Sequence, residues 1–144
     1  MKIAIANDHG GLDLKNAIMK HYKGKYDFIN CGTDTYDSCD YPLFAFKACE
    51  LVASKKADFA IVICKSGIGM SIAANKVKGI RCALIDNTTN ARLCHQHNNA
   101  NAIALGANDV STRKAYKIID AYIEAKFETR HQRRIDLISN YENN

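Results

Sequence analysis

Short apolar runs alternate with segments of helical periodicity along the whole chain of 144 residues. The apolar runs predict five strands, at Lys2–Ala6, Asp27–Cys31, Phe59–Ile63, Ile80–Ile85 and Ala102–Leu105. Apolar residues three and four apart predict helices over Leu14–Tyr22, after Pro42, and over Ile68–Lys76, Thr88–His97, Ser111–Phe127 and Arg130–Asn140. Such alternation is typical of a parallel sheet with helices on both faces. We therefore predict an α/β chain, a single doubly wound, Rossmann-like domain over residues 1–144 with a five-stranded parallel sheet and a C-terminal helix.

The run Phe59–Ile63 contains no polar residue, as expected of a central parallel strand that is covered on both faces. In doubly wound sheets, ligands bind beyond the carboxyl ends of the strands. Four segments that follow strands also carry the most reactive side chains: Asp8–Gly11, Asp40–Tyr41, Cys64–Met70 and the region leading to His97–Asn98. We expect these segments to lie together at that edge.

The formal net charge of +5 raises the question of a polyanionic partner. The lysines are scattered, whereas all six arginines follow residue 80 and three of them lie between residues 130 and 134. Arginine suits bidentate contacts to phosphate. The chain has no Trp, no RNA-binding signature and no aromatic platform. These features favour a small phosphorylated ligand over nucleic acid.

The six cysteines show no CxxC spacing, and several lie in apolar runs, where Cys acts as a small buried hydrophobe. Neither a disulfide framework nor a structural zinc site is expected. No apolar run is long enough to span a membrane. The first residues contain no hydrophobic signal core, so we expect a cytoplasmic protein without a membrane partner.

The segment Cys64–Ser71 combines a nucleophile with a glycine-rich turn. Gly67 and Gly69 permit a tight turn with inward-pointing amides directly before a predicted helix. Such amides bind anions, either a phosphate or an oxyanion formed during reaction, and the glycine spacing matches neither dinucleotide nor nucleoside-triphosphate motifs. Beside these amides and Lys65, Cys64 is expected to favour the reactive thiolate. A buried strand-end cysteine is the alternative interpretation.

Further side chains have two interpretations each. His95 and His97 suggest a metal site, but no nearby Asp, Glu or suitably spaced Cys completes it, so neither metal nor cofactor is expected. One histidine serves better as a proton donor or acceptor near neutral pH. Arg130 and Arg134 share a helix face and form either a fork for phosphate or a solvated basic face. Ser66 is either a helix cap or a hydroxyl that orients a sugar.

Together these residues resemble the family of ribose-5-phosphate isomerase B, which includes galactose-6-phosphate isomerase. The resemblance extends from residue 3 to about residue 138, with the matching strings in the family's order. The strings are Asp8-His9-Gly10-Gly11, Asp40-Tyr41-Pro42, Gly67 to Lys76, Gly79-Ile80-Arg81, His97-Asn98 with Ala100-Asn101, and Arg130-His131 with Arg134. The string from Gly67 to Lys76 is the most specific.

The resemblance implies an aldose–ketose isomerase that interconverts ribose 5-phosphate and ribulose 5-phosphate in the non-oxidative branch of the pentose phosphate pathway. Cys64 would move the proton between the two carbons through an enediolate. The substrate-binding turn would comprise Lys65, Gly67, Ile68, Gly69 and Ser71. Ring opening would involve His97, assisted by Asp8 and Ser66. Tyr41 and Asn98 would hold sugar hydroxyls, and His9, Arg130 and Arg134 would hold the phosphate.

The resemblance also implies a homodimer with shared active sites, or a tetramer formed by two such dimers. The His97 segment and the arginine segment would come from different chains. No cofactor and no metal are implied.

Three positions depart from the family's pattern. Lys65 replaces the usual Gly, Ser66 replaces the commoner Thr, and Asn108 stands where an arginine often contacts phosphate. Met70 occupies the position of the glutamate base of the family's second type, which favours the cysteine type. Two other functions remain open: isomerisation of a six-carbon aldose phosphate (allose or galactose 6-phosphate), and binding of a sugar phosphate without turnover.

Overall fold

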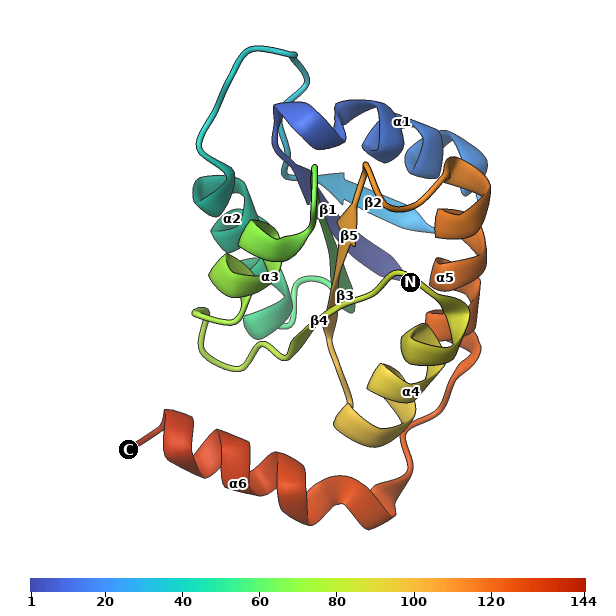
Figure 1. Cartoon of the computed structure of the whole chain (residues 1–144). Coiled ribbons are helices and arrows are strands. Elements are labelled where there is room, and N and C mark those ends of the chain that lie inside the picture. The colour runs from blue at the N-terminus through green and yellow to red at the C-terminus, as the bar shows by residue number, and fades with distance from the viewer.

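The computed structural model describes residues 1–144 and contains the predicted parallel sheet, with strand order β2-β1-β3-β5-β4 (Figure 1). The strands are β1 (Lys2–Asn7), β2 (Asp27–Asn30), β3 (Phe59–Cys64), β4 (Cys82–Leu84) and β5 (Ala102–Gly106). Strand β4 is shorter than predicted. The N–H of Arg81 donates to the side-chain oxygen of Asn101 at 2.8 Å, so the ladder begins one residue later.

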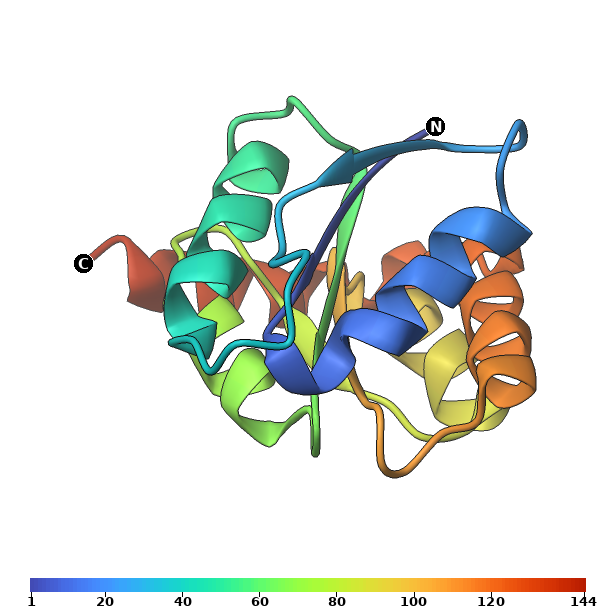
Figure 2. The same ribbon diagram turned by 90° about the horizontal axis from the view of Figure 1, so that it is seen from above.

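Six α-helices surround the sheet: α1 (Leu12–His21), α2 (Tyr41–Ala53), α3 (Ile68–Ala74), α4 (Thr88–Asn98), α5 (Thr112–Glu124) and α6 (Gln132–Glu142). Short 3₁₀ turns precede α1 and α6 at His9–Gly11 and Thr129–His131. Helices α1, α4 and α5 cover one face and α2 and α3 the other (Figure 2), which confirms the α/β prediction. Helix α3 is two residues shorter than predicted, because the N–H groups of Lys76 and Val77 bond three residues back and tighten its last turn.

The two faces of the sheet carry side chains of different size. Toward α1, α4 and α5 the inner strands present mostly large residues, namely Ile3, Ile5, Phe59, Ile61, Ile63, Ile103 and Leu105. Toward α2 and α3 they present small ones, namely Ala4, Ala6, Ala60, Val62, Cys64, Ala102 and Ala104. Because side chains alternate along a strand, this strict alternation of size gives two separate cores. Cys64 belongs to the small-residue face.

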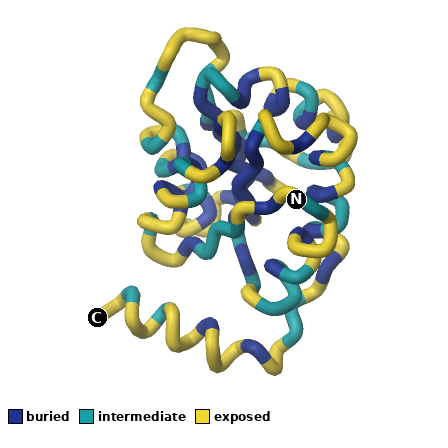
Figure 3. The backbone as a smooth tube through the Cα atoms, viewed as in Figure 1, coloured by how far each residue is buried: buried dark blue, intermediate teal, exposed yellow.

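Helix α6 contrasts with the rest of the molecule. It lies beside the body and is mostly exposed (Figures 1 and 3), with Leu137, Ile138 and Tyr141 in solvent and Ile135 buried. A hydrogen bond of 2.8 Å from the N–H of Gly79 to a Glu142 carboxylate oxygen ties its far end to the body. No helix of the chain combines the length and apolar character needed to cross a membrane.

Candidate active site

Parallel pairing brings several predicted segments together where the strands end, here called the carboxyl edge. Asn7 pairs with Ile63, and Cys64 pairs with Gly106, so β1, β3 and β5 end side by side. The N–H of Asp8 donates to the carbonyl of Ile63 at 3.2 Å, which holds the segment after β1 against the end of β3. The sheet therefore places Asp8 and Cys64 on adjacent strand ends, as predicted.

The turn after β3 depends on Gly67. This residue has φ +75°, and a Cβ there would lie 2.6 Å from Leu84 Cδ1 and 2.9 Å from the carbonyl carbon of Leu105. Its N–H donates to the sulfur of Cys64 at 3.2 Å. Cys64 is 6% exposed. The turn thus presents a backbone amide to a nearly buried sulfur, an arrangement that suits a negatively charged thiolate.

The turn also contains free donors. The backbone N–H groups of Lys65, Ser66, Gly69 and Met70 have no hydrogen-bond partner within the chain. The N–H of Ile68 donates to Ser66 Oγ at 3.2 Å, so Ser66 caps the helix start while its hydroxyl hydrogen remains available. Because α3 has seven residues, the local amides rather than a long helix dipole make this turn suitable for an anion.

Two further predicted residues contact this turn. The ring of Tyr41 lies against Gly69, where an added Cβ would be 2.7 Å from Tyr41 Cζ. The side chain of Lys65 lies over Gly10, where an added Cβ would be 2.5 Å from Lys65 Cγ. Ser71 donates its hydroxyl to the carbonyl of Ile68 at 3.0 Å and is thereby engaged within α3.

Asp8 and His9 are oriented by the backbone. Asp8 is 7% exposed and accepts the N–H of Gly10 on Oδ1 at 2.9 Å. His9 Nδ1 accepts the N–H of Cys39 at 3.3 Å. Accepting on Nδ1 assigns the proton of a neutral imidazole to Nε2. His9 is therefore a donor on its other nitrogen, as a phosphate contact requires.

Burial raises the pKa values of four thiols that lie outside the turn. Burial raises the pKa of Cys49 to about 12 and that of Cys94 to about 11. Burial also raises the pKa values of Cys31 and Cys82. These thiols remain protonated near neutral pH and are unsuited to proton abstraction. All six cysteines are free of disulfides.

The structure contradicts the expected position of His97 and Asn98. They end α4, which leads from the carboxyl end of β4 back to the start of β5. They lie at the opposite end of the sheet, here called the amino edge, and Figure 1 shows the end of α4 and α6 there. The length of β5 separates them from the Cys64 turn, roughly 13 Å for four steps of about 3.3 Å. The prediction of their position failed because the whole of α4 separates these two residues from the carboxyl end of β4.

Arg130 and Arg134 lie at the amino edge with His97. Arg130 Nε donates a hydrogen bond to Glu128 Oε2 at 2.9 Å, and Arg130 Nη2 forms an ion pair with the same oxygen at 2.7 Å. His97 Nε2 is 3.9 Å and His131 Nε2 is 3.8 Å from the same oxygen. Arg134 Nη1 lies 3.4 Å from His131 Nδ1. These contacts link His97 to both arginines within one polypeptide, which contradicts the expectation that the His97 segment and the arginine segment come from different chains.

Glu128 is the residue of this cluster that the sequence prediction missed. The argument against a metal relied on the lack of a carboxylate near His97, and that ground is wrong, because Glu128, His97 and His131 have ligand atoms within 4.8 Å of one another. Its position two residues before Arg130 is the sequence signal by which Glu128 could have been found. The pKa of His131 is lowered by burial and by the charges of Arg130 and Arg134, which keeps its ring neutral.

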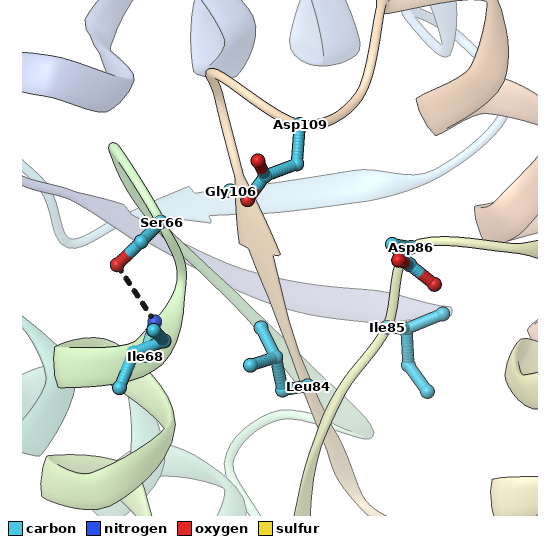
Figure 4. A pocket seen from close by; sticks show the side chains of 7 residues that line it. All are labelled: Ser66, Ile68, Leu84, Ile85, Asp86, Gly106 and Asp109. Carbon is cyan, nitrogen blue, oxygen red and sulfur yellow. Dashed lines mark hydrogen bonds between the residues drawn. The ribbon is translucent and has the colours of Figure 1, made fainter.

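A pocket of about 240 Å³ lies beside the Cys64 turn (Figure 4). Its lining residues are Ser66, Ile68, Leu84, Ile85, Asp86, Gly106 and Asp109. The carboxylates of Asp86 and Asp109 disfavour a phosphate in this pocket. The His9 side of the turn suits a phosphate better.

Known proteins of one family match this chain along nearly its whole length. The profile of the family described as Ribose/Galactose Isomerase matches residues 3–138. Ribose-5-phosphate isomerase B of Mycobacterium tuberculosis is 38% identical over 146 residues, covering 99% of this chain and 90% of that protein. The structure of Clostridium thermocellum ribose-5-phosphate isomerase B has a TM-score of 0.96 and 44% identity, covering 99% of this chain and 98% of that one. The Mycoplasma genitalium ribose-5-phosphate isomerase B structure, with bound ribulose 5-phosphate, has a TM-score of 0.93 and 42% identity, covering 99% and 96%.

Proposed function

Because the chain belongs to the ribose/galactose isomerase family, we propose that it interconverts ribose 5-phosphate and ribulose 5-phosphate, with Cys64 as the base. The observation that carries the proposal is the sulfur of Cys64 beside a turn whose amides are free. Residues 1–144 form one isomerase domain. It acts in the cytoplasm, in the non-oxidative branch of the pentose phosphate pathway.

The reaction moves one proton between neighbouring carbons. The Cys64 thiolate removes the proton from C2 of the open-chain aldose, and the electron pair of that C–H bond forms the enediolate double bond while the aldehyde oxygen becomes negative. Free amides of the turn hold this oxygen. The thiol then returns the proton to C1 while the proton of the C2 hydroxyl passes to the C1 oxygen, which gives the C2 carbonyl of the ketose and regenerates the thiolate. No redox partner is consumed.

The phosphate lies near His9 in this proposal. Lys65 supports that position, because its side chain packs over Gly10 beside His9, and its carbonyl accepts the N–H of Asn108 at 2.9 Å. Lys65 and Asn108, two of the three departures from the family pattern, are therefore neighbours. The ammonium of Lys65 supplies a cation close to where Asn108 lacks one.

Ring opening needs the other edge of the sheet. His97, with Arg130 and Arg134, lies too far from Cys64 of the same chain to act on one sugar. We therefore place each active site between two copies, with Cys64, Asp8, His9, Tyr41 and Ser66 from one chain and the amino-edge residues from its partner. The exposed apolar side chains of α6 fit such an assembly, as a dimer or a pair of dimers.

The first test compares wild type with Cys64→Ala on ribose 5-phosphate, allose 6-phosphate and galactose 6-phosphate. We expect ribose 5-phosphate turnover in the wild type and a loss of about 100-fold or more in a folded Cys64→Ala protein. Faster turnover of a six-carbon sugar phosphate would change the proposed substrate but would leave Cys64 as the proposed base. Binding without conversion of any aldose would refute the isomerase and indicate a binding protein.

A second test addresses the shared site. Cys64→Ala and His97→Asn chains are each expected to be inactive as homodimers. Random mixing of equal amounts gives half heterodimers with one intact site of two, and hence about one quarter of wild-type activity. Unmixed Cys64→Ala protein is the control. Failure of the mixture to recover activity, with exchange verified by mass, would refute the shared site.

A further inference from the structure

Glu128 occupies the centre of the amino-edge cluster. Its Oε2 accepts a hydrogen bond from Arg130 Nε at 2.9 Å, forms an ion pair with Arg130 Nη2 at 2.7 Å, and lies 3.9 Å from His97 Nε2. His131 Nε2, 3.8 Å from the same oxygen, is buried and has no hydrogen-bond partner. One carboxylate thus contacts Arg130 and faces His97, two of the side chains by which this edge would serve the sugar phosphate.

The backbone holds Glu128 in place. Its N–H donates to the carbonyl of Gln96 in the last turn of α4 at 2.9 Å, and its carbonyl accepts the N–H of His131 at 3.0 Å. The first bond ties the segment after α5 to the helix that carries His97. Because both bonds use main-chain atoms, a change of the Glu128 side chain leaves them available.

From this geometry we infer that Glu128 is a positioning residue that orients His97 for ring opening and Arg130 for phosphate. The inference rests on the proposed function. A carboxylate beside Nε2 of His97 leaves Nδ1 of the same ring for the sugar. Because the Nε and Nη2 side of Arg130 faces this carboxylate, the Nη1 side of its guanidinium is left for the phosphate.

A divalent metal is the competing use of these side chains. Two histidines and a glutamate have the composition of a zinc site. However, Arg130 already occupies the Glu128 oxygen, and Arg134 lies 3.4 Å from His131 Nδ1. Two guanidinium charges oppose a divalent cation at this distance. The charges therefore favour a positioning carboxylate.

The test uses the fact that ribulose 5-phosphate cannot close a furanose ring, since its C5 oxygen carries the phosphate. Exchange of its C1 hydrogen in deuterium oxide needs enediolate formation but no ring opening. In Glu128→Gln we expect kcat for ribose 5-phosphate to fall about tenfold or more, whereas saturated exchange from ribulose 5-phosphate stays within about twofold of wild type. KM should rise for both sugars through Arg130.

Glu124→Gln is the matched control, because it removes the same charge from the end of α5, and the side chain of Glu124 forms none of the ion pairs in the structure. Glu128→Asp keeps the charge and should have a kcat between wild type and Glu128→Gln. Thermal unfolding and the size of the assembly verify that each variant is folded.

Four results would overturn the inference: equal losses of turnover and exchange in Glu128→Gln, no loss of either, the same loss in Glu124→Gln, or a Glu128→Asp kcat no higher than that of Glu128→Gln. Calorimetric binding of Zn²⁺ that disappears in Glu128→Gln would assign the cluster to a metal instead. Wild-type protein without turnover or exchange would refute the proposed function itself, and the role of Glu128 with it.

Discussion

The two edges of the sheet hold their functional residues by different means. At the carboxyl edge, strand pairing, a left-handed glycine and main-chain amides place a Cys64 that is 6% exposed. At the amino edge, ion pairs hold exposed side chains, with Arg130 66% and Glu128 39% exposed. Backbone geometry resists salt and side-chain substitution, whereas exposed charges are screened. The fold itself therefore positions Cys64, whereas surface charge positions Arg130 and Glu128.

The largest contrast between the edges is expected in thiol chemistry. Cys64 lies at the carboxyl edge, and Cys94 lies on α4, the helix that ends in His97. At about pH 8 a pKa of about 11 leaves roughly 0.1% of Cys94 as thiolate. We expect iodoacetamide to modify Cys64 at least about 100-fold faster than Cys94, as measured by peptide mass spectrometry. Ribose 5-phosphate should protect Cys64, and equal rates at the two sites would erase this contrast.

A glycine substitution breaks the carboxyl edge alone. Gly67→Ala adds left-handed strain and a contact at 2.6 Å, which together destabilise the protein by about 3 kcal/mol and displace the amide on Cys64. Gly79→Ala has a similar φ of +88° but meets nothing within 4 Å, so we expect about 1–2 kcal/mol and retained activity. Urea unfolding measures both. Equal destabilisation would mean that the turn is not closely packed.

The smallest effect is expected from acid at the amino edge. The folded pKa of His131 is below its ordinary value of 6.5, through burial and neighbouring positive charge. Between the two values the unfolded chain binds more protons, so stability is complete above about pH 6.5 and falls as the pH drops toward the lower folded value. His131→Gln should lose less stability than wild type between about pH 7.5 and pH 5 in urea titrations. An unchanged difference would contradict this account.

The sequence predicted what local pattern determines. Apolar runs gave the five strands, and Gly67 and Gly69 gave the turn at Cys64 because conformational freedom is a property of single residues. The sequence pattern did not reveal that His97 lies far from the carboxyl edge. Its position depends both on the place of β4 in the sheet and on the length of α4, which runs back along the sheet. Nor did the pattern reveal Glu128, whose role depends on a main-chain bond to Gln96, 32 residues earlier in the chain.

The unequal faces of the sheet also determine how freely this sequence can drift. Apart from glycine, every amino acid one nucleotide away from alanine is larger, and the α2 and α3 side, built on alanines, has little space for a larger residue. The opposite side is built on isoleucines, which can change to valine at about 1 kcal/mol. Neutral variation should therefore accumulate behind α1, α4 and α5, while the layer behind Cys64 stays nearly fixed.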